Sequence, residues 1–62
     1  MEENKFRFPK SIVYLGRVYN LVKMGAKGQV VAVYESEDFG IRTMFTENMF
    51  KYHEHYGEIE RR

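Results

Sequence analysis

The sequence predicts a small all-β domain in which about five antiparallel strands form a meander that curls into a barrel. Short runs rich in β-branched and aromatic residues recur along the chain, and glycines separate them. At 62 residues the chain is long enough for one domain but not for two. We expect residues 6–58 to form the domain, and residues 1–5 and 59–62 to be flexible tails.

Aromatic side chains are the expected source of the core. The chain has no cysteine, so neither a disulfide nor a thiolate zinc site is available to stabilise so small a domain. It has five phenylalanines and five tyrosines instead, and each large ring buries on the order of 150–250 Å². We expect Tyr19 and Phe45 in the core, and Phe6, Phe8 and Phe39 to be exposed.

The first four strands are expected at residues 11–15, 18–23, 29–34 and 41–45. Gly16-Arg17 is the expected first turn, and residues 24–28 and 35–40 form the next two connections. Strict alternation along the second strand places Tyr19, Leu21 and Lys23 on one face. The apolar run at 29–34 is continuous, which favours a strand buried on both faces at the centre of the sheet.

Residues 47–56 fit two structures. Thr46 is a helix-capping residue type, and a helical period follows it through Met49, Tyr52, His53 and Tyr56. The absence of an acidic residue at position 49 and the presence of Gly57 disfavour a long helix. We therefore predict a short helical turn at 47–50, followed by a closing strand near 52–56.

Two resemblances to known families concern the fold. The first is to KOW modules, SH3-like barrels that bind RNA or protein, and it rests on Gly25-Ala26-Lys27-Gly28-Gln29-Val30-Val31-Ala32-Val33. The second is to an uncharacterised family of short bacterial proteins with the pattern Y-x-G-x-x-Y, V-V-x-x-Y and R…M-F. It rests on Tyr14 to Tyr19, Val30 to Tyr34, Phe39-Gly40-Ile41-Arg42 and Met49-Phe50. Both imply a small SH3-like barrel, and neither implies a catalytic activity.

The charge distribution is asymmetric although the net charge is only +1. Residues 4–34 hold six basic residues and no acidic one, whereas residues 35–62 hold seven acidic and four basic residues. Cations interleaved with exposed rings are typical of proteins that bind single-stranded nucleic acid. The candidate nucleic-acid-binding residues are Arg7, Lys10, Arg17, Lys23, Lys27, Phe39 and Arg42. A solvated rim of charge explains the same pattern without a ligand.

No catalytic or metal-binding set emerges from the sequence. His53 and His55 would share a face on a strand, but a metal site needs further ligands, which only Glu58 or Asp38 could supply. An exposed strand end is the better interpretation. Ser11 and Ser36 lack a nucleophile motif, and Gly25 and Gly28 lack the pattern of a phosphate-binding loop. We expect no catalytic residue, cofactor, metal or small-molecule substrate.

These observations predict a non-enzymatic binding module, and nucleic acid is the first candidate ligand. The alternative is a protein-interaction module that docks on a larger partner and regulates it, because a small barrel leaves strand edges open. Compact chains without cysteine are often encoded by phages or mobile elements. No segment reads as a membrane span or a secretory signal, so we expect a cytoplasmic protein with no membrane partner.

Overall fold

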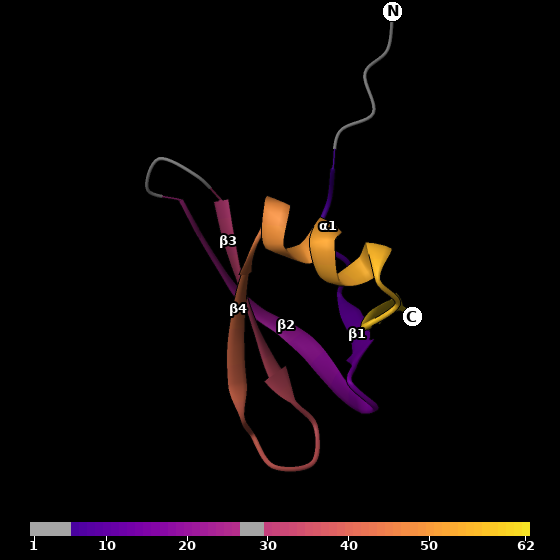
Figure 1. Ribbon diagram of the computed structural model, residues 1–62. Helices are drawn as coiled ribbons and strands as arrows, with labels where there is room; N and C mark the ends of the chain where they lie inside the picture. The colour runs from indigo at the N-terminus through magenta and orange to yellow at the C-terminus, as the bar shows by residue number, and fades with distance from the viewer. Residues whose placement is uncertain (1–5, 27–29) are drawn as a thin grey trace, which may run out of the picture.

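The computed structural model describes residues 6–26 and 30–62, which form one curled antiparallel sheet and one helix (Figure 1). The elements are β1 (Ser11–Tyr14), β2 (Arg17–Ala26), β3 (Val30–Ser36), β4 (Arg42–Thr46), α1 (Glu47–His55) and β5 (Ile59–Arg61). The strands lie in the order β4-β3-β2-β1-β5, and every neighbouring pair is antiparallel. The predicted fold class is confirmed: the protein is all-β, with five antiparallel strands curled into a half-barrel and one short helix before the last strand.

The turn between β1 and β2 is Leu15-Gly16, one residue earlier than predicted. Tyr14 pairs with Arg17, so the loop has two residues, and both have positive φ (52° and 80°). Two-residue loops of this kind follow the right-handed twist of a hairpin. Glycine adopts this φ without strain, whereas Leu15 does so at a cost, and its amide donates to the carbonyl of Glu58 at 3.1 Å.

A β-bulge in β2 changes which side chains face the interior. Leu21 pairs with Tyr34, but Lys23 pairs with Val33, so Val22 is left without an opposite residue. Leu21 therefore faces the interior with Tyr34, and Lys23 lies on the outer face. The prediction that Tyr19, Leu21 and Lys23 share one face is wrong, because the extra residue reverses the alternation after Leu21.

Strand β2 is also longer than predicted. Residues 24–26, expected in a loop, continue the strand, and residues 27–28 of that expected loop lie outside the described residues. The middle strand of the sheet is β2 rather than the apolar strand β3, because β5 pairs with β1 and adds a strand on that side.

Strand β3 is buried on one face only. Ala32, Tyr34 and Ser36 are buried, whereas Val31 and Val33 are half-buried on the opposite face. The expected burial on both faces is wrong because only the concave side of the sheet is covered. The core on that side consists of Ile12, Tyr19, Ala32, Tyr34, Phe45, Phe50 and Ile59, which confirms the core positions predicted for Tyr19 and Phe45.

Helix α1 replaces the predicted helical turn and closing strand. The hydroxyl of Thr46 accepts a hydrogen bond from the amide of Met49 at 3.2 Å, so the predicted cap is present. The helix then continues to His55, and in this added turn the ring of His53 packs against Tyr14 and Phe45. The closing strand predicted near 52–56 is wrong, and the helical period through Tyr52 and Tyr56 was the correct alternative.

Gly57 ends the helix and directs the chain into β5. Its φ is +78°, its amide donates to the carbonyl of Glu54 at 3.1 Å, and the amide of Glu58 donates to the carbonyl of His53 at 2.8 Å. This pair of hydrogen bonds is the Schellman motif, which glycine favours. Residues 59–62 were predicted to be a flexible tail, but Ile59–Arg61 form β5, because Ile59 is buried in the core.

Residues 6–10, which we call the lead-in segment, are attached to the domain by hydrogen bonds. The hydroxyl of Tyr34 donates to the carbonyl of Pro9 at 2.7 Å. The amide of Leu21 donates to the carbonyl of Lys10 at 2.8 Å, and the guanidinium of Arg61 donates to the carbonyl of Arg7 at 3.2 Å. Strands β2, β3 and β5 therefore each hold the lead-in segment by one hydrogen bond, although the segment is not itself a strand.

The buried phenol of Tyr34 makes stability sensitive to alkaline pH. Burial raises the pKa of Tyr34 from 10.0 to about 12, although the nearby Arg61 acts in the opposite direction. The folded state thus holds the phenol proton more tightly than the unfolded chain. We expect the free energy of unfolding to fall by about 2 kcal/mol as the pH rises from 10 to 12.

Chemical denaturation at a series of pH values measures this effect. The control is Tyr34→Phe, which lacks the hydroxyl and should lose stability at neutral pH but show a shallower decline above pH 10. Equal alkaline declines in the two proteins would show that another group is responsible.

Candidate binding groove

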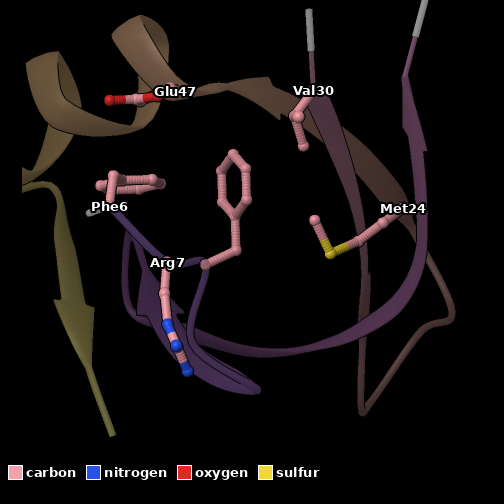
Figure 2. Close-up of a pocket in the computed structure, with 6 residues that line it drawn as sticks. Phe6, Arg7, Met24, Val30 and Glu47 are labelled. Carbon is pink, nitrogen blue, oxygen red and sulfur yellow. The ribbon is translucent and has the colours of Figure 1, made fainter.

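An apolar groove of about 340 Å³ lies between the lead-in segment, the ends of β2 and β3, and the start of α1. We call it the apolar groove. Figure 2 shows Met24 and Val30 on one side and Phe6 on the other, with Glu47 on the helix and the Arg7 side chain at the margin, directed away from them. The full lining is Phe6, Arg7, Phe8, Met24, Val30 and Glu47.

Packed aromatic rings fix one wall of the groove. Phe6 and Phe8 stand edge to face with centroids 4.9 Å apart, and they lie 5.4 and 5.6 Å from the ring of Phe50. The guanidinium of Arg61 lies over Phe6 and Phe50, 5.5 and 5.3 Å from their centroids. Edge-to-face and cation–π contacts of this kind each add up to about 1 kcal/mol. This wall is therefore in place before any ligand binds.

Phe6 and Phe8 are thus half-buried, contrary to the expected exposure. The lead-in segment crosses the concave side of the sheet, where Phe50 packs against both rings and Arg61 lies over Phe6.

The opposite wall is adaptable and open to solvent. Met24 and Val30 come from the inner face of β2 and β3, yet their exposed fractions are 50% and 44%. Methionine is unbranched and polarizable, so Met24 is suited to packing against varied shapes. A half-exposed apolar wall beside a fixed aromatic wall leaves room for a side chain from outside the domain.

Opposite charges flank the groove. Arg7 is exposed, and the carboxylate of Glu47 forms an ion pair with Lys51 at 2.8 Å. No ion pair joins Arg7 to another residue in the part of the chain that the structure describes. The groove therefore combines an apolar floor with one basic group that is available to a ligand.

The predicted nucleic-acid residues separate into different regions. Of the six that lie among the described residues, only Arg7 lines the apolar groove. Lys10 is exposed at the end of the lead-in segment, and Lys23 is exposed on the outer face of β2. Lys27 lies outside the described residues.

The other three predicted residues gather around the connection between β3 and β4. The guanidinium of Arg17 lies 4.9 Å from the ring centroid of Phe39, which is 69% exposed, and it pairs with Asp38 at 3.3 Å. Arg42 pairs with Glu35 at 3.3 Å. Each arginine is thus next to a carboxylate, which offsets its attraction for a phosphate.

Ser36 organises the same connection. Its side chain is buried, and its hydroxyl accepts hydrogen bonds from the amides of Phe39 at 3.3 Å and Ile41 at 2.9 Å. The hydroxyl therefore holds the turn between β3 and β4.

The histidines have different environments because they lie on a helix rather than on a strand. His53 is half-buried, its Nδ1 lies 2.5 Å from a carboxylate oxygen of Glu58, and its ring contacts Tyr14 and Phe45. His55 is exposed, and its ring lies edge to face with that of Tyr56. Residues two apart on a helix do not share a face, and residues 6–26 and 30–62 contain no group of three or more potential metal ligands.

The sequence showed part of this groove. Phe6, Arg7 and Phe8 already stood out as basic and aromatic residues beside the domain. Met24, Val30 and Glu47 are the lining residues that sequence reasoning missed, because the bulge in β2 turns Met24 inward and no sequence pattern placed that bulge.

Comparison of the chain with protein-family profiles, with curated proteins and with solved structures finds no match in any of the three. Within the described residues, the single helix α1 is too short to cross a membrane.

Proposed function

We propose that the protein is a non-enzymatic binding module that takes an apolar side chain of a partner protein into the apolar groove. The composition of the lining carries this proposal. Four of its six residues, Phe6, Arg7, Phe8 and Met24, are of the types that are enriched at the centres of protein interfaces. Aromatic and arginine anchors also account for most hot spots of binding energy.

The size and openness of the groove favour a peptide over an enclosed small molecule. About 340 Å³ is near the lower limit for ligand sites, and those sites bury most of their ligand. Here Met24 and Val30 remain about half exposed, so a bound group would stay continuous with the solvent side. An extended segment that inserts one apolar side chain, with an acidic residue near Arg7, fits this shape and charge.

The fold supports the same class of function. We further propose that the half-barrel belongs with the small SH3-like barrels, on the strength of its five curled antiparallel strands and the helix before β5. The likeness to KOW modules and to the short bacterial family remains a prediction.

Selection of a random peptide library on the protein tests the proposed function. We expect enriched peptides to share one apolar residue with an acidic neighbour, and Val30→Glu to weaken their binding by about tenfold or more, because it places a charge in an apolar contact. The matched control is Val22→Glu, because Val22 is a β-strand valine with a similar exposed fraction, 46% against 44%. Failure to enrich any peptide that depends on Val30, or equal weakening by the two variants, would contradict the proposal.

Nucleic acid is the second candidate ligand. It is favoured by Arg7, Lys10 and Lys23, which are exposed and form no ion pair within residues 6–26 and 30–62. Binding dominated by phosphate contacts weakens steeply with salt.

An amide-shift titration with single- and double-stranded oligonucleotides measures this alternative. If nucleic acid is the ligand, shifts cluster near Arg7, Lys10 and Lys23 at low salt and disappear at physiological salt. The amide shifts near Arg17 and Arg42 should change less, because each of those cations is already paired with a carboxylate. A spectrum that stays unchanged at low salt would remove this candidate.

A further inference from the structure

The outer edge of β4 is an open edge of the sheet. Strand β4 pairs with β3 on one side, and no strand in the described residues pairs with its other side (Figure 1). An unpaired edge offers a row of backbone donors and acceptors to any extended chain. No residue of β4 lines the apolar groove, so this edge is a separate surface.

The hydrogen-bond pattern shows which backbone groups point outward. The amide of Ser36 donates to the carbonyl of Ile41 at 2.8 Å, so these opposite residues form a hydrogen-bonded pair. Bonded and non-bonded pairs alternate along an antiparallel ladder. In the observed register the next bonded residues of β4 are therefore Thr43 and Phe45. The residues whose backbone groups point to the open edge are Arg42, Met44 and Thr46.

The side chains at this edge do not protect it. Met44 is 60% exposed, and Ile41 just before the strand is 45% exposed. Natural edge strands are commonly blocked by lysine, proline or a bulge, and β4 has none of these. Its only charged residue, Arg42, is directed to Glu35 of β3.

We propose that a second copy of this chain pairs with the open edge, β4 against β4, antiparallel about a twofold axis at Met44. In this register Met44 lies opposite Met44 of the second copy, and Arg42 lies opposite Thr46. All six outward-pointing residues of the two strands are then in hydrogen-bonded pairs. The two half-barrels form one continuous sheet.

The charges at the two ends of β4 favour the antiparallel direction and a second copy as partner. Arg42, which pairs with Glu35, begins β4, and Glu47, which pairs with Lys51, follows directly after its end. Antiparallel pairing brings each Arg42 next to the Glu47 end of the other copy, whereas parallel pairing would align like charges. Self-complementary ends of this kind are what a twofold interface requires.

Sedimentation equilibrium of the full chain over a range of concentrations tests the proposal. We expect the apparent mass to rise from 7.5 kDa towards twice that value. Met44→Lys should raise the dimer dissociation constant by about tenfold or more, because it places two lysines opposite each other. The control is Met49→Lys, the same change at an exposed methionine of α1, which should leave the constant unchanged.

Amide hydrogen exchange of the unaltered chain gives an independent measurement that does not depend on the folding of a variant. At low concentration the amide of Met44 should exchange rapidly while that of Thr43 is protected, and Met44 should gain protection as the concentration rises. A mass of 7.5 kDa at every concentration would overturn the proposal. Equal effects of Met44→Lys and Met49→Lys, or no concentration-dependent protection of Met44, would do the same.

Discussion

The hydrogen bond from the hydroxyl of Tyr34 to the carbonyl of Pro9 is the constraint on which the candidate site depends. Tyr34 is fully buried in β3, so the bond ties the lead-in segment to the inside of the sheet. This position brings Phe6 and Phe8 against Phe50 of α1. Together with the hydrogen bonds from Leu21 to Lys10 and from Arg61 to Arg7, this contact makes the lead-in segment a wall of the domain.

The same constraint connects stability with binding. A domain of this size has a small core, so partly buried rings at its border contribute to folding as well as to any interface. Arg61 joins the two roles, because it bonds the carbonyl of Arg7, pairs with Glu54 and covers the rings of Phe6 and Phe50. The fixed wall is therefore part of the fold, whereas Met24 and Val30 on the other wall are left free to adapt.

Local patterns predicted the fold class and most strands, because β-branched runs and glycine turns are local properties. The errors arise where a distant contact decides. Residues 51–55 also suited a strand, but they are helical and pack His53 against Tyr14 and Phe45. Residues 59–61 were expected in a tail, but burial of Ile59 places them in a strand. The bulge after Leu21 depends on pairing with β3. Of the candidate site, the sequence indicated Phe6, Arg7 and Phe8, but not the residues they face.

The most direct test of this account is a nuclear Overhauser experiment on the free protein. The account predicts contacts from the rings of Phe6 and Phe8 to the ring of Phe50, and a slowly exchanging Tyr34 hydroxyl proton close to Pro9. It also predicts contacts between Phe8 and the side chains of Met24 and Val30 across the groove. Random-coil shifts for Phe6 and Phe8, with no contact to Phe50, would show that the lead-in segment is not attached and would contradict the groove itself.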